Sequence, residues 1–222
     1  MTSLPKPVRR HPVLVAIAGA LSLGLSGFVA GRAVQQVRSD QMAPWILGRA
    51  SGIAAYLLLV ALVLVGLLLA HPSRAITGGS SPGRIRVHIT LALFTLCFTA
   101  LHVVVLATDR YAGVGWAGAA LPLGASYRPV AVTLGLLGLW TGLLAGSSAA
   151  LAGHLPRRWW WPVHKAAAST LALVWVHGVL AGSDSPTLLW LYVGSGLLVL
   201  GAAVWRYVAR RTLQPAPARS RR

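Results

Sequence analysis

The sequence predicts an all-α membrane protein with six transmembrane helices, and three observations carry that prediction. The 222 residues are 56% hydrophobic and only 10% charged, whereas about a quarter of the residues in a soluble domain are charged. The apolar residues gather in continuous runs of roughly 20, the length that spans a bilayer core, and do not alternate as β-barrel strands do. The lysines and arginines cluster between these runs, as in membrane loops.

The apolar runs define the predicted helices. They are Val13–Gly31, Trp45–Ala70, Ile85–Ala107, Val130–Leu151, Trp160–Ala181 and Thr187–Val208. The first run follows basic residues, as a signal peptide does. It is longer than the usual apolar stretch of about 7–15 residues and no clear cleavage site follows it, so we predict that it is retained.

The connections between the runs are short, which predicts antiparallel neighbours in one bundle. The predicted parts of the chain are an N-terminal tail (1–12), the first helix (13–31), a four-helix core (45–182), the sixth helix (187–208) and a basic tail (209–222).

The loop charges predict the orientation. With the N-terminus inside, 15 of the 20 basic residues lie on the cytoplasmic side, and all three acids, Asp40, Asp109 and Asp184, lie outside. The positive-inside rule then places both termini in the cytoplasm. The net charge of +17 does not indicate a nucleic-acid partner, because the basic residues form no continuous face. We therefore expect the protein to be surrounded by lipid, in a plasma membrane.

Four of the seven histidines lie within two predicted helices: His88 and His102 on the third, His164 and His177 on the fifth. Polar residues at membrane depth are costly and indicate a functional site by default. For one such histidine, an interhelical hydrogen bond explains the residue equally well. Two matched pairs favour a site.

The spacings place these histidines at two depths. His88 and His102 are 14 residues apart, which is a rise of about 21 Å and a difference of only about 40° around the helix axis. The fifth helix runs in the same direction, so His164 is expected near His88 and His177 near His102. Their 13-residue spacing puts His164 and His177 about 140° apart on an ideal helix, which requires that helix to be bent or irregular.

Two imidazoles in an apolar core favour haem iron as the ligand. Zinc usually needs a fourth protein ligand or a water molecule, and the single cysteine, Cys97, provides no thiolate site. Haem iron needs only two axial ligands, because its porphyrin supplies four nitrogens. Two such haems, stacked across the bilayer, predict electron transfer through the membrane.

The two spacings resemble those of the ferric reductase-like transmembrane domain of ferric reductases and NADPH oxidases, in which two helices each carry two haem-ligating histidines. The resemblance extends to the segments Gly48-Arg49-Ala50-Ser51-Gly52 and Trp159-Trp160-Trp161-Pro162-Val163-His164, and covers roughly residues 45–182. It implies a cytochrome b that carries two haems b, with the four histidines as iron ligands.

The resemblance also implies partners. Fused members of this family continue into FAD- and NAD(P)H-binding domains, and this sequence shows no dinucleotide-type glycine motif. The chain is therefore similar to stand-alone bacterial members, such as the haem-bearing membrane subunit of methionine-sulfoxide reductase systems. Electrons are then expected from a cytosolic flavin reductase or a quinol. The acceptor is expected to be a periplasmic or other outer-side protein or a ferric chelate. Whether a flavin also binds stays open.

Arg49, at the outer end of the second predicted helix, is a candidate for binding a haem propionate, because guanidinium pairs well with carboxylate. The alternative is that it extends to the lipid headgroups. For the whole protein, two alternatives remain. One is a haem-free transporter or channel whose histidines relay protons or bind a metal ion. The other is a structural membrane scaffold.

Overall fold

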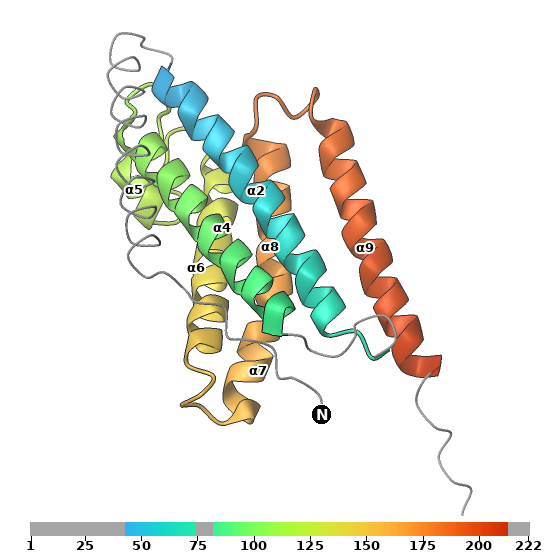
Figure 1. Cartoon of the computed structure of the whole chain (residues 1–222). Helices are drawn as coiled ribbons and strands as arrows, with labels where there is room; N and C mark the ends of the chain where they lie inside the picture. The colour runs from blue at the N-terminus through green and yellow to red at the C-terminus, as the bar shows by residue number, and fades with distance from the viewer. Residues whose placement is uncertain (1–42, 74–81, 213–222) are drawn as a thin grey trace, which may run out of the picture. The chain divides into compact units, whose positions relative to one another are not determined.

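The computed structural model describes residues 43–73 and 82–212, and every regular element in these ranges is a helix. The helices, shown in Figure 1, are α2 (Ala43–Leu69), α4 (Pro82–Thr108), α5 (Gly115–Ala120), α6 (Pro129–Ala150), α7 (Arg157–Lys165), α8 (Ala167–Ala181) and α9 (Leu189–Thr212). The predicted N-terminal tail (1–12), the first helix (13–31) and the last ten residues of the C-terminal tail lie outside the described residues.

Five helical segments are long and apolar enough to cross a membrane, and they match the second to sixth predicted helices. Proline helps to set their ends. Pro82 and Pro129 are the first residues of α4 and α6, where the missing N–H has no helical partner in any case. α2 ends shortly before Pro72, because the residue before a proline is disfavoured in helical conformation.

The fifth predicted helix is interrupted at Ala166, where α7 ends and α8 begins. The backbone N–H of Ala166 is shared between the carbonyls of Pro162 and Val163, each at 3.1 Å, and the N–H of Ser169 reaches back three residues to Ala166 at 2.9 Å. Pro162 has no N–H with which to continue the ladder. The interruption provides the irregularity that the 13-residue spacing requires, and both His164 and His177 face histidines of α4.

α6 and α8 pack closely because α6 carries glycine on the shared face. A Cβ atom on Gly138 would lie 2.8 Å from Val174, and one on Gly142 would lie 3.3 Å from Thr170. The Thr170 hydroxyl donates to the Thr141 hydroxyl at 3.0 Å. Small residues and side-chain hydrogen bonds of this kind hold membrane helices together.

α9 is attached to the bundle by buried aromatic residues. Tyr56 of α2 and Tyr192 of α9 are buried, with their ring centroids 5.3 Å apart. The Tyr56 hydroxyl hydrogen-bonds to Ser195, and the Trp175 ring nitrogen donates to the Tyr192 carbonyl at 2.9 Å. These contacts join α9 to α2 and α8 and position Tyr56 and Tyr192 beside the cavity described below.

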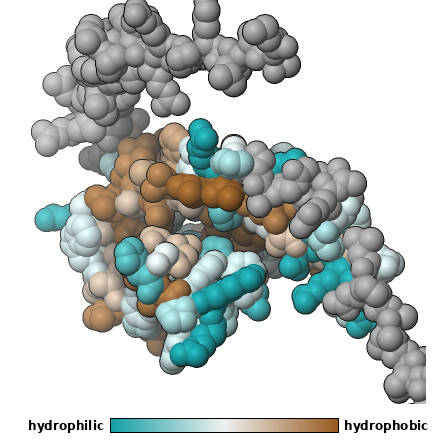
Figure 2. All heavy atoms as spheres, turned by 60° about the horizontal axis from the view of Figure 1, so that its bottom comes forward, coloured by the Kyte–Doolittle hydropathy of each residue, from teal (hydrophilic) through white to brown (hydrophobic). Residues whose placement is uncertain are grey.

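The outward faces of the helices are apolar. On α4, for example, Ala107 is the one buried residue, while Val87 and Phe94, which do not line the cavity described below, are more than half exposed. Figure 2 shows apolar residues along the flank and hydrophilic residues gathered at the end that carries α7. An apolar flank beside a polar end is the surface expected of a protein surrounded by lipid.

Candidate cofactor-binding site

The structure brings together the two histidine pairs that the spacing predicts. His88 of α4 lies opposite His164 of α7, with ring centroids 6.3 Å apart and ring planes at 77°. His102 of α4 lies opposite His177 of α8, again with centroids 6.3 Å apart and planes at 79°. α4 therefore presents two imidazoles, one towards α7 and one towards α8, which gives two imidazole pairs, one near each end of the bundle.

The separation within each pair fits two ligands of one metal ion. With metal–nitrogen bonds of about 2.0 Å and about 1.1 Å from nitrogen to ring centre, two collinear imidazoles on one ion have centroids about 6 Å apart. A direct hydrogen bond between the rings would need the two nitrogens within about 3.2 Å of each other. At 6.3 Å between centroids the rings are too far apart for that bond.

Backbone carbonyls orient His102 and His177. Nδ1 of His102 lies 2.7 Å from the carbonyl oxygen of Gly48, and Nδ1 of His177 lies 2.7 Å from that of Ala131. A carbonyl oxygen can only accept, so Nδ1 carries the proton in both rings. Nε2 of the neutral ring then has a free lone pair. Metal-binding histidines show this same arrangement, with the second nitrogen donating to a carbonyl or carboxylate.

The rings of His88 and His164, at the other end of the cavity, have weaker orienting contacts. Nδ1 of His164 lies 3.3 Å from the Ala145 carbonyl, which is beyond the usual hydrogen-bond range. Nδ1 of His88 is buried, and no acceptor among the described residues meets hydrogen-bond geometry with it. The Leu62 carbonyl interacts with His88 only in a looser electrostatic sense.

The backbone partners repeat along the neighbouring helices. Gly48 and Leu62 are 14 residues apart on α2, and Ala131 and Ala145 are 14 apart on α6. The same interval separates the two histidines of α4. Each of the two neighbouring helices thus offers one carbonyl at the level of each histidine pair, although the contacts are shorter at the His102–His177 pair.

Glycine makes room for three of the four imidazoles. A Cβ atom on Gly52 would lie 2.7 Å from Nδ1 of His102, and one on Gly135 would lie 2.8 Å from Nδ1 of His177. A Cβ atom on Gly66 would lie 3.3 Å from Cε1 of the His88 ring. Atoms that close would push the rings aside at the first two positions and press on the third.

All four histidines line one cavity of about 1020 Å³. A cavity of this size exceeds what one drug-sized ligand needs. Between the pairs its wall consists largely of leucine, alanine, glycine and threonine, with Tyr56 and Tyr192. Trp45, Arg49 and Asp184 line the end near the His102–His177 pair, while Lys165 and Arg206 line the opposite end.

Arg49 lines the cavity, as a residue that binds a ligand carboxylate should, but it already has a protein partner. Its guanidinium forms an ion pair with Asp184 from the loop between α8 and α9. It also lies over the Trp45 ring, 5.8 Å from the ring centroid. The sequence did not predict the Asp184 contact, because nothing local connects two residues 135 positions apart.

The tryptophans that precede His164 divide into two kinds. Trp161 stacks on the His164 ring at 6.2 Å and 28°, and the Trp160 ring centroid lies 6.1 Å from it. Trp159 points away and is 65% exposed. Two of the three therefore contact the His164 ring, and of these Trp161 lines the cavity. The third is placed where an interfacial residue is expected.

The sequence analysis named Gly48 and Gly52 only as part of a resembling segment, and it did not predict that glycines pack against the imidazoles or that backbone carbonyls orient them. One signal was present, since Gly52 and Gly66 repeat the 14-residue interval of the α4 histidines. In the described ranges no three histidine, cysteine, aspartate or glutamate side chains come together as a metal site, so each pair offers only two protein ligands. Comparisons with protein-family models, with curated proteins and with solved structures found no match to this chain.

Proposed function

We propose that this chain is a b-type cytochrome of the membrane, which carries electrons between the two faces of the bilayer through two haems, each ligated by one histidine pair. The observation that carries the proposal is that His88 with His164, and His102 with His177, have equal ring separations of 6.3 Å in one shared apolar cavity. A hydrogen-bonding role would require shorter separations, and a protein-only zinc site would require more ligands.

The residues present suit an iron porphyrin. The macrocycle provides the four equatorial nitrogens that the protein lacks, and the wall between the pairs is apolar. Bound haem iron supplies reversible one-electron chemistry. His102 and His177 contribute an oriented Nε2 lone pair, fixed by the hydrogen bonds of Nδ1. The surrounding leucines and alanines exclude water, which lowers the local dielectric constant.

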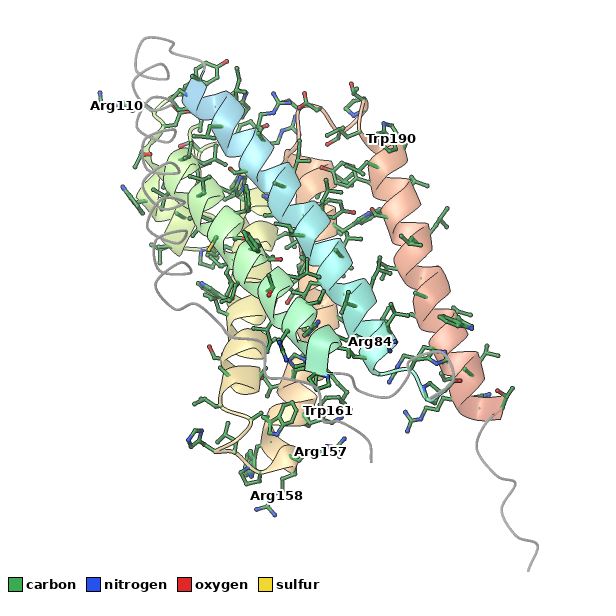
Figure 3. All side chains as sticks on the ribbon, viewed as in Figure 1. Arg84, Arg110, Arg157, Arg158, Trp161 and Trp190 are labelled. Atoms are coloured by element: carbon green, nitrogen blue, oxygen red, sulfur yellow. The ribbon has the colours of Figure 1, made fainter. Side chains whose placement is uncertain are left out.

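Charge distribution supports an orientation. The end near His88 and His164 carries Arg84, Arg157 and Arg158, which Figure 3 shows at that end together with Trp161. The last turn of α9, at the same end, adds Arg210 and Arg211. The acids Asp109 and Asp184 lie at the other end. By the positive-inside rule the His88–His164 end faces the cytoplasm.

In this orientation electrons enter near His88 and His164 and leave near His102 and His177. The donor is a cytosolic flavin reductase or a membrane quinol, and the acceptor is an outer-side protein or a ferric chelate. These partners come from the resemblance to ferric reductase-like proteins, and the chain's own residues supply ligation and spacing.

Vesicles test the function directly. The purified chain is reconstituted into liposomes that contain ferricyanide, with potassium and valinomycin present so that one potassium ion balances each electron that enters, and dithionite is added outside. Each electron that crosses should reduce one encapsulated ferricyanide, and the rate should be proportional to the amount of protein. We expect His102→Ala to stop the reaction. A rate equal to that of protein-free vesicles would contradict the proposal. A colourless chain that instead moves protons or metal ions would favour the transporter alternative.

A further inference from the structure

The cavity end near His88 and His164 contains positive charge without a protein counter-ion. Lys165 of α7 and Arg206 of α9 both line it. The whole chain has three acids, Asp40, Asp109 and Asp184. Of these, the two that the structure describes lie at the opposite end, so no carboxylate of the described ranges is available to either cation.

Arg206 is fixed by one contact and retains donors. Its Nε donates to the carbonyl of Ala70 at 2.9 Å, at the C-terminal end of α2. In the described ranges neither terminal nitrogen of its guanidinium has a hydrogen bond or ion pair. A C-terminal capping role explains the Nε contact but leaves these two nitrogens unused. They form the planar pair of donors that matches a carboxylate.

The position of Arg206 mirrors that of Arg49. Arg49 precedes Gly52 by three residues, and Gly52 packs against His102. Ala70, the residue that Arg206 contacts, follows Gly66 by four residues, and Gly66 packs against His88. At about 1.5 Å per residue, Arg49 lies within one helical turn of the His102 level, and Ala70, the contact of Arg206, lies about one turn beyond the His88 level towards the nearer cavity mouth. Arg49 has Asp184 as a partner, whereas no acid among the residues that the structure describes pairs with Arg206.

We infer that Arg206, assisted by Lys165, binds a carboxylate of the tetrapyrrole held between His88 and His164. This inference rests on the proposed function. An unpaired guanidinium facing an apolar membrane cavity is costly, and a carboxylate within one turn of the histidine level removes that cost. The inference assigns a ligand-binding role to α9, which contributes no histidine to the site.

The test measures coupling between the arginine and the ligand's carboxylates. In a His102→Ala background, which leaves only the His88–His164 pair, the chain is titrated with haem and with haem dimethyl ester, whose carboxylates are blocked. Arg206→Gln is compared with the background chain, with Arg206→Lys as the conservative variant. Arg210→Gln is the matched control, because Arg210 is one turn further along α9 and does not line the cavity.

We expect Arg206→Gln to weaken haem binding about tenfold and the ester to bind the unsubstituted background about tenfold more weakly than haem. Combining the two changes should add little, because both remove one interaction. Arg206→Lys should recover part of the affinity, and Arg210→Gln should change nothing. Additive losses, or equal binding of haem and ester, would overturn the inference.

Two further outcomes have separate meanings. If the effect of Arg206→Gln appears only in nanodiscs that contain anionic lipid and vanishes in zwitterionic lipid, a lipid headgroup is the partner and the inference is wrong. If the chain without any substitution binds neither haem nor haem dimethyl ester, the proposed function fails, and the inference fails with it.

Discussion

His102 and His177 each direct Nδ1 to a backbone carbonyl at 2.7 Å, whereas at the other end of the cavity His164 has a 3.3 Å contact and His88 has only a weak interaction with the Leu62 carbonyl, short of hydrogen-bond geometry. The ring separations of the two pairs are nevertheless identical at 6.3 Å. Helix spacing therefore sets the distance between ligands, while the neighbouring helices determine how firmly each ring is oriented. The two ends of one cavity are expected to bind the same group with different strengths.

The largest effect should come from removing one ligand of a pair. His102→Ala or His177→Ala should abolish haem at that pair and leave the other occupied, because the two levels share no ligand. We expect the absorbance of the reduced α-band to fall by about half, with the remaining half retaining a low-spin spectrum. Loss of all absorbance in either single variant would show that haem binding at one histidine pair depends on the other pair.

The glycines provide the next test. Gly52→Ala and Gly135→Ala each place a Cβ atom within 3 Å of an imidazole, so each should weaken haem binding at the His102–His177 pair by about 10- to 100-fold. Haem affinity is measured by titration of the apoprotein. Alanine itself favours a helix over glycine by about 1 kcal/mol, so a loss cannot come from helix propensity.

Two variants of the same type serve as comparisons. Gly66→Ala leaves 3.3 Å to His88, and we expect a change of only a few-fold. Gly201→Ala on α9 meets nothing within 4 Å, does not line the cavity and should not change the affinity. If Gly201→Ala were as harmful as Gly135→Ala, close packing against the histidine would not be the cause.

The unequal support of the two pairs predicts an order of release. In increasing denaturant, haem should leave the His88–His164 pair first, because its rings have weaker orienting contacts. Absorbance followed in the His102→Ala and His88→Ala variants assigns each release to a pair. Simultaneous release from both levels, or earlier release from His102 and His177, would mean that the Nδ1 contacts do not control retention.

The smallest effect is expected at the ion pair. Asp184→Asn removes the partner of Arg49 but leaves the guanidinium at the cavity mouth. Because both side chains are partly exposed, the free energy of unfolding should change by less than about 1 kcal/mol. Arg49→Gln removes the cavity cation as well and should lower haem retention at His102 and His177. Equal haem loss in the two variants would show that Arg49 acts only through Asp184.

Much of the fold follows from local sequence. Continuous apolar runs predicted the five candidate membrane spans of the described residues to within a few residues, because hydrophobic length is a local property. The pairing of histidines across helices also followed from local spacing, since rise per residue fixes depth. The short helix α5 in the loop before α6 was not predicted, because its six residues are too few to show a helical period and two of them are glycine, the weakest helix former after proline.

The remainder depends on contacts between distant segments. The interruption at Ala166 was required by the 13-residue spacing but could not be located, because Pro162 alone predicts a change of direction four residues earlier. The carbonyls of Gly48 and Ala131 accept from histidines more than 40 residues away. Every residue has a backbone carbonyl, so the sequence does not tell which carbonyls accept from a histidine. Only the packed bundle shows this.

The most direct test of two-level ligation is the haem content of the purified full chain after expression with ample haem supply. A pyridine haemochrome assay, with protein quantified by amino-acid analysis, should give about two haems b per chain. The reduced spectrum should be that of bis-histidine low-spin iron. A colourless chain, or a haem content that is unchanged when all four intramembrane histidines are replaced by alanine, would contradict the proposal.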